Sequence, residues 1–591
     1  MELKKGIGVS TGVVIGPALL LDNDEIRIGR RAITLAEVAA EQQRLRTALT
    51  AASDDLRDLR ERTRRNLGKE MAAIFDFHLA LLNDPQLQTA FSQGIERDGH
   101  SAEFAVRRAL REYGKHFTEH PDAYFRERVK DIYDLERRLL QHLMGAEKIR
   151  LEPTDQPVII VAHDLTPSQT ASLDKSKVRG IAIEAGGRTS HTAILANSLG
   201  IPAVVGLESL TREVTTGDVL VVNGYSGVVI IDPDAATIEE HQKYEQRQVQ
   251  YRTQLDSMRH LPARTKDGVD IKLFGNIEFP HEVDTALAKG AMGIGLYRTE
   301  FLYLAGGHEP TEEDHYAAYC RVLQCMGQRP VVIRTLDLGA DKYSPFQDQV
   351  PEANPFLGFR SIRLCLGNLR IFKTQLRAIL RASTRGDLRL MFPLISTPLE
   401  LRQAKMVLKD TMEELDEQNI PYNPHLRVGM MVEVPSTALL PKPYVRDCDF
   451  LSIGTNDLIQ YTLAVDRGNQ RVASLYSAAN PAVLRLIKNV IWSARSRRRA
   501  ISLCGEMGGD PDFTLLLVGL GLRQFSVAPQ HIPEIKKVIR SMNARHARQM
   551  AQRALGFEHT QQVMGFLREE TLKILPDIFS EVPAKPVTPR V

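Results

Sequence analysis

The sequence has few of the features that mark secreted, membrane-spanning or strongly charged proteins. It contains five cysteines, an odd number, and no two of them form a C-x-x-C pair. We therefore expect reduced thiols and a cytoplasmic protein. The net charge is only +3, which favours neither nucleic acid nor a membrane surface as a partner. No apolar run is long enough to cross a bilayer, and the N-terminus lacks a signal-peptide core.

Two nucleotide-binding patterns are also missing. The chain has no G-x-x-x-x-G-K-[ST] loop, and Gly6, Gly8 and Gly12 do not form a dinucleotide fingerprint because no helix follows them at once. What is present is an ordinary globular composition, with 43% hydrophobic and 25% charged residues. A chain of 591 residues is too long for one core, so we expect roughly two to four domains.

In the N-terminal third, the spacing of apolar residues changes from a strand pattern to a helical pattern and then back. After an apolar strand at Pro17–Leu21, residues at helical spacing predict helices around 35–59, 74–82, 102–117 and 126–143. These helices suggest an all-helical insert, most of whose apolar residues would form its core. The alternative is that one exposed face of the insert docks a protein partner.

Strands return after the helical insert and alternate with helices, which predicts a compact α/β module ending near Asp232. The expected strands are Val158–Ala162, Ile181–Ile183, Pro202–Val205 and Val219–Val222. Residues 236–260 are polar with helical character and predict a linker helix or hairpin. The proline-rich tail after Asp577 is expected to be disordered.

The second half repeats a strand–helix unit, and eight such units predict a TIM barrel. Its expected strands are Ile271–Ile277, Met292–Leu296, Val331–Leu336, Leu388–Ile395, Val428–Val432, Phe450–Ile453, Ile501–Cys504 and Phe525–Ala528. The predicted fold is therefore multidomain α/β. Its expected parts are an α/β module (1–22 and 148–232), a helical subdomain (23–147), a helical linker (233–265), a barrel (266–576) and a tail (577–591).

A single histidine stands in the turn that joins one strand of the α/β module to a helix. The segment is Gly186-Gly187-Arg188-Thr189-Ser190-His191-Thr192, and Thr189 and Ser190 are good N-cap candidates. His191 should therefore lie in the first helical turn, where free N–H groups and the helix dipole favour an anion. A neutral imidazole there could carry a phosphoryl group. The alternative is a capped helix with one polar histidine.

Charged side chains gather at the predicted ends of the barrel strands, where TIM barrels place their active sites. Arginine forks suit phosphate and carboxylate oxygens. Two carboxylates, with substrate oxygens and water, can complete a Mg²⁺ site. A thiol also stands there, although most free cysteines are inert core residues. The residues concerned are Arg298, Arg334, Lys342, Arg360, Glu433, Asn456, Asp457, Arg467 and Cys504.

The string GGRTSHTAILANSLGIPAVVG resembles the phosphohistidine segment of the phosphoenolpyruvate-utilising enzymes. That family includes Enzyme I of the sugar phosphotransferase system, pyruvate phosphate dikinase and phosphoenolpyruvate synthase. The motifs GLYRTEF, VIRTLD, NPFLGFR, MVEVP, SIGTNDLIQYTLAVDRGN and CGEMGGD resemble those of Enzyme I, and the resemblance covers nearly the whole chain. The sequence departs from the pattern at Ala340, Val434 and 477–480, where no charged group of the proposed site is lost.

The resemblance implies a role for each matching residue. His191 would carry the phosphoryl group, and Cys504 would protonate the enolate. Glu433 and Asp457 would hold Mg²⁺. The phosphoenolpyruvate would be bound by Arg298, Arg334, Lys342, Arg360, Asn456, Asp457 and Arg467. A histidine phosphocarrier protein would dock on the helical insert near His78, Leu81, Leu87 and Arg128.

We therefore expect a phosphoenolpyruvate-protein phosphotransferase that passes phosphate from His191 to a carrier protein for sugar uptake. The resemblance also implies a homodimer through the barrels and a swivelling α/β module, so that one histidine visits two sites. A regulatory, nitrogen-type Enzyme I is an alternative, although its N-terminal sensor domain is missing. A nucleotide-using dikinase or synthase is disfavoured because no nucleotide-binding domain is seen. A degenerate signalling scaffold would be expected to have lost site residues that are present.

Overall fold

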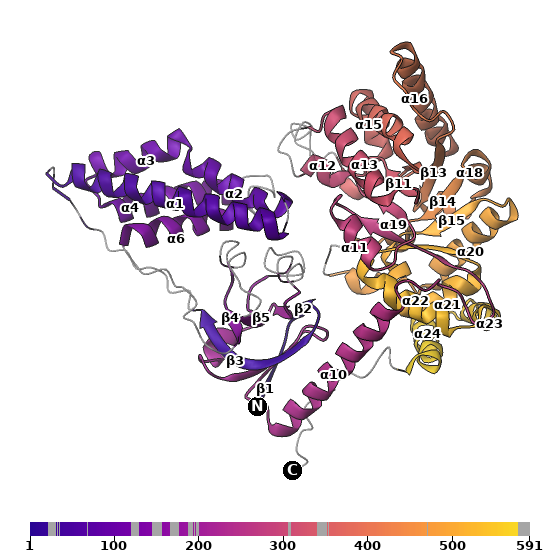
Figure 1. Ribbon diagram of the computed structural model, residues 1–591, viewed down its shortest axis with the longest axis horizontal. Coiled ribbons are helices and arrows are strands. Elements are labelled where there is room, and N and C mark those ends of the chain that lie inside the picture. Colours follow the sequence, from indigo (N-terminus) through magenta and orange to yellow (C-terminus); the bar gives the residue numbers. More distant parts are fainter. Residues whose placement is uncertain are drawn as a thin grey trace. The chain divides into compact units, whose positions relative to one another are not determined.

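The computed structural model describes residues 1–21, 31, 33–34, 36–67, 69–119, 129–144, 157–165, 169, 177–186, 193, 196, 200–304, 309–339, 352, 354–467, 469 and 471–576. These residues form two compact units (Figure 1), one within Met1–Gln250 and the other within Tyr251–Ser580. None of the described helices is both long and apolar enough to span a membrane.

A mixed sheet forms the base of the first unit, with strand order β1-β8-β7-β3-β4-β5-β6-β2. The strands β3, β4, β5 and β6 pair in parallel, and the other pairings are antiparallel. The sequence predicted four of these strands and the end of β3, but not β1, β2 or β8. The bounds are β1 Glu2–Lys5, β2 Ile7–Ser10, β3 Val13–Leu21, β4 Val158–Ala162, β5 Val178–Ile183, β6 Ala203–Val205, β7 Val219–Asn223 and β8 Val228–Ile231.

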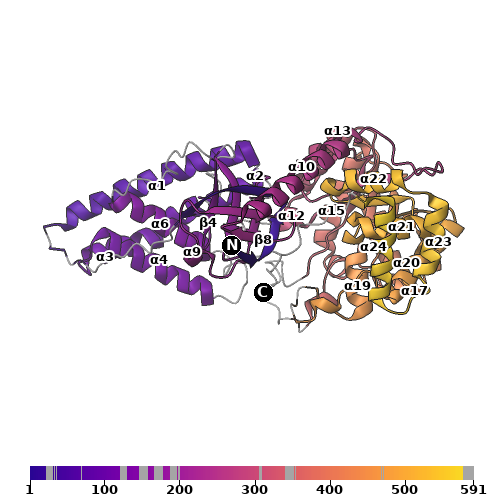
Figure 2. The same ribbon diagram turned by 90° about the horizontal axis from the view of Figure 1, so that it is seen from below.

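Five described helices between β3 and β4 pack around their own apolar core. They are α1 Val38–Leu67, α2 Lys69–Leu82, α3 Pro85–Glu96, α4 Ala102–Glu119 and α6 Val129–Met144, and Figure 2 shows them as roughly aligned rods. The sequence reading missed α3. Its N-terminus is marked by Asp84, whose carboxylate accepts a hydrogen bond from the Gln86 N–H, and by Pro85 in the first turn, which is the usual position of a helix proline.

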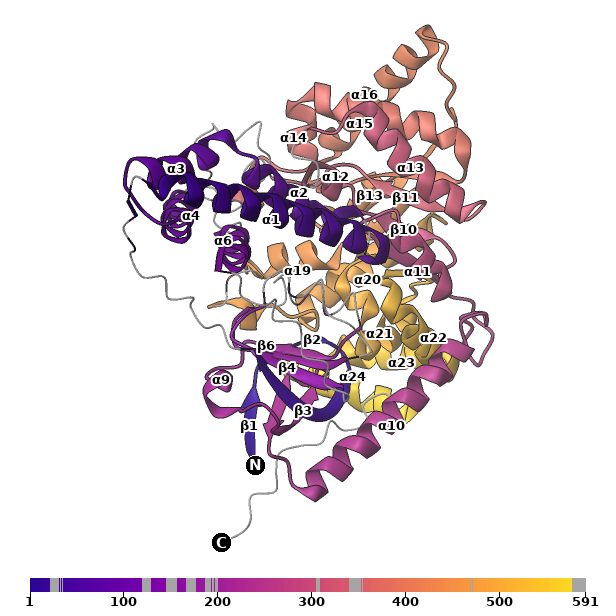
Figure 3. The ribbon, with the colours of Figure 1, turned by 60° about the vertical axis from the view of Figure 1, so that its left-hand side comes forward.

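The second unit is built on a closed parallel barrel, β9 to β16, as the sequence predicted. Figure 3 shows β10, β11 and β13 of this barrel among the helices of the unit. All eight predicted strands are present, with ends that differ by at most a few residues. Their bounds are β9 Lys272–Ile277, β10 Ile294–Tyr297, β11 Val331–Arg334, β12 Leu388–Phe392, β13 Arg427–Val432, β14 Phe450–Ile453, β15 Ala500–Leu503 and β16 Gln524–Val527. Each barrel strand pairs in parallel with its neighbours. The carboxyl ends of all the strands therefore lie at the same mouth of the barrel.

Helices surround the barrel and bury their apolar faces against its outer surface. Several begin with strong caps, and Thr397 and Thr311 each close a capping box. The helices of this unit are α11 Glu282–Ala288, α12 Glu300–Leu304, α13 Glu312–Met326, α14 Ile362–Gly367, α15 Leu369–Ala382, α16 Pro398–Glu417, α17 Pro435–Leu439, α18 Lys442–Asp447, α19 Thr455–Leu463, α20 Pro481–Ser496, α21 Pro511–Leu520, α22 Ile532–Ser541, α23 Ala544–Ala554 and α24 Thr560–Ile574.

Two helices complete the described chain. The short α9 (Leu210–Glu213) follows β6, and α10 (Ala235–Ser257) covers most of the segment predicted as a linker helix. The fold class is thus confirmed, with a mixed α/β sheet, a helical region and a C-terminal closed barrel. The exact domain limits remain a proposal.

Candidate active site

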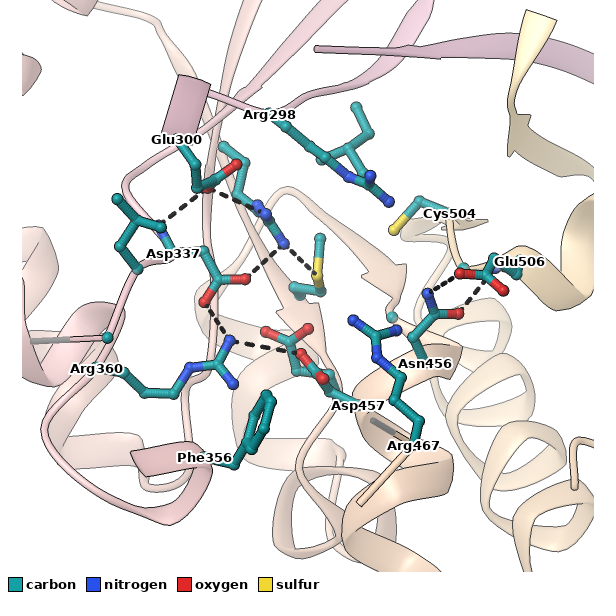
Figure 4. A pocket seen from close by; sticks show the side chains of 18 of the residues that line it. Arg298, Glu300, Asp337, Phe356, Arg360, Asn456, Asp457, Arg467, Cys504 and Glu506 are labelled. Atoms are coloured by element: carbon teal, nitrogen blue, oxygen red, sulfur yellow. Dashed lines mark hydrogen bonds and ion pairs between the residues drawn. The ribbon is translucent and has the colours of Figure 1, made fainter. Parts of the chain in front are cut away.

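A cavity of about 600 Å³ lies at the mouth of the barrel, where the strands end. Eight of the residues predicted from the sequence line it, and they lie at the end of β11 or in the loops and helices that follow β10, β11, β13, β14 and β15 (Figure 4). These residues are Arg298, Arg334, Arg360, Glu433, Asn456, Asp457, Arg467 and Cys504. Lys342 lies outside the described residues. The barrel therefore brings together side chains that lie far apart in the sequence.

Arg334, the last residue of β11, lies buried between two carboxylates. Its guanidinium is 3.0 Å from Glu300 Oε1 and 2.7 Å from Asp337 Oδ2. Burial opposes its charge, but Asp337 and Glu300 outweigh that effect and raise the guanidinium pKa. Arg334 is therefore a permanent, preoriented cation.

Asp337 also contacts Arg360, whose Nη2 lies 3.0 Å from Asp337 Oδ1 and 3.8 Å from Asp457 Oδ2. Burial opposes ionisation of Asp337, yet the two arginines hold its carboxyl pKa below the usual value. The Arg360 guanidinium lies 5.7 Å from the centre of the Phe356 ring and donates to the Tyr461 hydroxyl at 3.3 Å. One carboxylate thus aligns two cations toward the cavity.

The opposite wall of the cavity carries further polar pairs (Figure 4). Arg298 contacts Glu278. The Asn456 carboxamide donates to Glu506 Oε1 at 2.9 Å and accepts from the Glu506 N–H at 3.0 Å. These contacts orient both side chains on the cavity wall before any ligand is bound.

Two further carboxylates, Glu433 and Asp457, line the cavity and are buried, with only 2% and 9% of their surfaces exposed. Burial, with Asp337 and Asp457 nearby, raises the pKa of Glu433 to about 8. Burial, followed by Asp337, also raises the pKa of Asp457. A Cβ built at Gly454 would lie 2.7 Å from Glu433 Oε2. A larger residue at this position would therefore clash with the Glu433 carboxylate.

This carboxylate pair fits a divalent cation, because a bound cation would offset the burial and the repulsion by Asp337 that raise both pKa values. Among the residues that the structure describes, no group of three His, Cys, Asp or Glu side chains is arranged to hold a metal ion. The protein would therefore supply two oxygen-bearing side chains, and substrate oxygens and water would supply the remaining ligands.

Cys504 follows β15 and faces the cavity with 3% of its surface exposed. Its Sγ lies 3.6 Å from the Ile453 carbonyl oxygen, and burial raises the pKa of the thiol to about 11. At neutral pH the side chain is therefore a protonated thiol that can donate, whereas a reactive cysteine nucleophile has a lowered pKa.

The structure corrects the prediction that His78, Leu81 and Leu87 form an exposed docking face. Their exposed fractions are 0%, 7% and 0%, so they belong to the buried interior of the helical region. The apolar spacing that suggested a docking helix is equally the spacing of a packed stripe. His78 lies 3.6 Å from Asp131 and 4.0 Å from Asp134. Arg128 lies outside the described residues.

The predicted phosphohistidine segment is described only at its edges. His191, Thr189 and Ser190 lie outside the described residues. Gly186 has φ +99°, a backbone conformation that glycine adopts readily. Ala193 and Ala196 are helical and have 2% and 0% of their surfaces exposed. The tight turn expected at the end of β5 is consistent with this geometry, and the position of His191 remains a prediction.

Sequence reasoning gave no role to four acidic residues that hold the cavity's polar side chains. Glu278 follows β9, Glu300 and Asp337 lie in the motifs after β10 and β11, and Glu506 lies in the motif after β15. The available signal was their place within three residues of a strand end, where a barrel gathers its polar side chains. Their pairing depends on contacts between neighbouring loops, which spacing in a single sequence does not reveal.

Three models of phosphoenolpyruvate-utilising enzyme domains match the chain. They describe an N-terminal domain (residues 5–128), a mobile domain (154–227) and a PEP-binding domain (252–544). A protein of Geobacillus stearothermophilus named phosphoenolpyruvate-protein phosphotransferase is 42% identical over 95% of this chain and 97% of its own length. The protein of that name from Bacillus subtilis (strain 168) is 40% identical over 96% of this chain and 100% of its own length. A solution structure of an Enzyme I protein covers 41% of this chain and 98% of its own, with 36% identity and a TM-score of 0.37.

Proposed function

Because this chain belongs to the family of phosphoenolpyruvate-utilising enzymes, we propose that it is a phosphoenolpyruvate-protein phosphotransferase. The observation that carries this proposal is the barrel cavity, in which buried arginines, two carboxylates and a protonated thiol face one space. Phosphoenolpyruvate has a phosphate, a carboxylate and a carbon that must gain a proton, and the cavity offers a chemical partner for each group.

The arginines bind the substrate's charged ends. Arg334 and Arg360 are held in direction by Asp337, so little rotamer entropy is lost when an anion binds between them. Arg298 and Arg467 add positive charge to the same cavity, and Asn456 offers a neutral donor. Lys342 belongs to the same proposal through the resemblance alone.

Glu433 and Asp457 would hold Mg²⁺, which supplies charge neutralisation at the transferring phosphoryl group when it is bound. The role of the two residues is to present ionised oxygens beside the arginines. Because the pKa of Glu433 is about 8 in the metal-free cavity, this carboxyl must lose its proton to serve as a ligand.

The transfer step then needs a nucleophile and a proton donor. A ring nitrogen of His191 attacks phosphorus, and the bond between phosphorus and the bridging enol oxygen breaks. The electron pair passes to the enolate, and Cys504 transfers its proton to the methylene carbon to give pyruvate. Solvent reprotonates the thiolate. The raised thiol pKa keeps this proton available at neutral pH.

The second half-reaction passes the phosphoryl group from His191 to a histidine of a phosphocarrier protein. We place carrier docking on the helical region and assign the shuttle between sites to movement of the α/β module, with α10 as the connecting segment. A homodimer through the barrels and a cytoplasmic location belong to the same proposal. Whether the carrier serves sugar uptake or a regulatory branch depends on the identity of that carrier.

Pyruvate release tests the reaction. Mixing the pure chain with phosphoenolpyruvate and Mg²⁺ should release a burst of at most one pyruvate per chain, because each His191 is charged once. Adding a histidine phosphocarrier protein should convert the burst into steady turnover. Continuous pyruvate release without a carrier, or no pyruvate in either mixture, would contradict the proposal.

A further inference from the structure

The carboxamide of Gln375 links two of the strand exits that carry the active-site arginines. Gln375 lies on α15, is completely buried and does not line the cavity. Its Oε1 accepts a hydrogen bond from the Leu336 N–H at 2.9 Å, and its Nε2 donates to Thr299 Oγ1 at 3.0 Å. Nε2 also lies 3.2 Å from the Tyr319 hydroxyl. One side chain therefore connects α15, on which it lies, with α13 and with the segments that follow β10 and β11.

The direction of these hydrogen bonds follows from simple chemistry. A backbone N–H can only donate, so the amide atom facing Leu336 is the oxygen and the other amide atom is the NH₂ group. The Thr299 hydroxyl, having accepted from Gln375, donates to the Arg334 carbonyl at 3.0 Å. Each polar group in this part of the cluster thus has a partner of the opposite kind.

The contacts of Tyr319 and His315 agree with this assignment of donors and acceptors. The Tyr319 hydroxyl lies 2.9 Å from His315 Nδ1. Burial lowers the pKa of His315 to about 4, so its ring is neutral and Nδ1 can accept a hydrogen bond from the Tyr319 hydroxyl. Tyr319 is therefore left to accept from Gln375, and the whole cluster is uncharged.

The groups that Gln375 holds are next to the groups that bind the substrate. Thr299 directly follows Arg298, and Leu336 lies between Arg334 and Asp337. The backbone N–H of Asp337 donates to Glu300 Oε1 at 3.0 Å. Three polar contacts, at the Arg334 carbonyl, the Leu336 N–H and the Asp337 N–H, therefore fix the turn after β11.

We propose that Gln375 is a positioning residue. It holds the segments that follow β10 and β11 in place relative to each other, and hence it sets the directions of Arg298, Arg334 and Asp337. This inference rests on the proposed function, because it assigns Gln375 to the binding of phosphoenolpyruvate without contact to it. Glutamine meets the requirement because one carboxamide accepts once and donates twice. An ionised glutamate has the same shape but cannot donate, and methionine has a similar size but makes none of the three contacts.

The test compares Gln375→Glu and Gln375→Met with the wild type as full-length chains, using phosphoenolpyruvate, Mg²⁺ and carrier protein. Small displacements of binding groups cost roughly 10- to 100-fold in rate, so we expect kcat/KM for phosphoenolpyruvate to fall by that amount in Gln375→Met. In Gln375→Glu the loss should be larger at pH 8 than at pH 6, because the protonated carboxyl regains a donor. The melting temperature is recorded at each pH.

Thr571→Val provides the matched control. Thr571 is also a fully buried polar residue of the barrel unit, and its hydroxyl donates to the Leu567 carbonyl at 3.0 Å. This variant should lose some stability while KM stays at the wild-type value. Tyr319→Phe provides a milder change if both Gln375 variants fail to fold, and it should raise KM by a smaller factor, roughly 2- to 5-fold.

Each outcome separates this inference from the proposed function. Wild-type turnover together with unchanged kcat/KM in folded Gln375 variants would overturn the positioning role and leave the function intact. A fall in kcat/KM for phosphoenolpyruvate in Thr571→Val as large as that in Gln375→Met would overturn it too, since the effect would then be general destabilisation. If the wild type itself releases no pyruvate from phosphoenolpyruvate, the proposed function fails.

Discussion

The Asp337 carboxylate lies 2.7 Å from the Arg334 guanidinium, with both side chains buried where β11 ends. The other oxygen of the same carboxylate lies 3.0 Å from Arg360. Removing one partner of a buried ion pair leaves an uncompensated charge. The shared carboxylate therefore both stabilises the barrel mouth and orients two substrate-binding arginines.

Removing that carboxylate should therefore affect both stability and activity. We expect Asp337→Ala to lower the free energy of unfolding of the barrel unit by roughly 3–5 kcal/mol, because two buried guanidinium groups lose a partner. Phosphoenolpyruvate-dependent pyruvate release should fall at least about 100-fold. Chemical denaturation and the burst assay measure the two effects.

The surface carboxylate Glu413 offers a control for Asp337. It pairs with Lys409 at 3.3 Å, and both side chains are more than half exposed. Glu413→Ala should change stability by less than about 1 kcal/mol and leave pyruvate release intact. A loss of similar size in the two variants would contradict the special role of Asp337.

Glu433 and Asp457 should control the dependence on divalent cation. We expect chelation by EDTA to abolish pyruvate release by the wild type and added Mg²⁺ to restore it. Glu433→Gln and Asp457→Asn should each raise the Mg²⁺ concentration needed for half activity by at least roughly 10-fold, because each removes one charged ligand. The exposed residue Asp410 supplies a matched control, Asp410→Asn. Unchanged Mg²⁺ titrations in the two cavity variants would rule out this assignment.

Cys504 should react slowly with alkylating reagents. Burial raises its pKa from 9.0 to about 11, and two pKa units correspond to about 100-fold less thiolate at pH 8. Iodoacetamide should therefore modify the exposed residue Cys325 long before Cys504, as mass spectrometry of digested samples would show. Rapid alkylation of Cys504 at pH 8 would indicate an ionised thiol and contradict its role as a proton donor.

The same shift has a consequence for stability. Because the folded-state pKa is the higher one, the native chain holds a proton that the unfolded chain loses between pH 9 and about 11. The contribution of Cys504 to stability should therefore fall as pH rises through this window. Cys504→Ser should show a shallower fall than the wild type between these two pH values.

Leu87 should act through packing in the helical region. It has no exposed surface, so Leu87→Ala should cost roughly 2–5 kcal/mol of stability and should melt the helices of the first unit at lower temperature. Below that temperature, phosphoryl transfer to a carrier should be near the wild-type rate. A selective loss of carrier transfer in a fully folded Leu87→Ala chain would restore the docking interpretation that the burial of this residue contradicts.

The barrel could be predicted from the sequence because its strands are short apolar runs at regular spacing. The same regularity placed Arg298, Arg334, Glu433, Asp457 and Cys504 at strand ends, and the structure gathers these residues around one cavity. The partners of these residues could not be predicted in this way. Whether Asp337 pairs with Arg334, Arg360 or both depends on how neighbouring loops meet, which periodicity does not encode.

The N-terminal unit shows where pattern reasoning failed and why. Helix α3 carries apolar residues at only a few positions, although Asp84 and Pro85 mark its start. The strands β1 and β2 are short and partly exposed, so their apolar signal is weak. The prediction that His78 and Leu87 lie on a docking face is wrong because the spacing of apolar residues on a helix does not reveal what covers them. They are covered by neighbouring helices of the same region.

The most direct test of the central claim is label transfer to His191. The wild type and His191→Ala would be incubated with Mg²⁺ and phosphoenolpyruvate labelled in its phosphate, and in parallel with labelled ATP. We predict acid-labile, base-stable label from phosphoenolpyruvate alone, present in the wild type and absent from the variant. Label from ATP, or label that persists in His191→Ala, would contradict the proposed reaction.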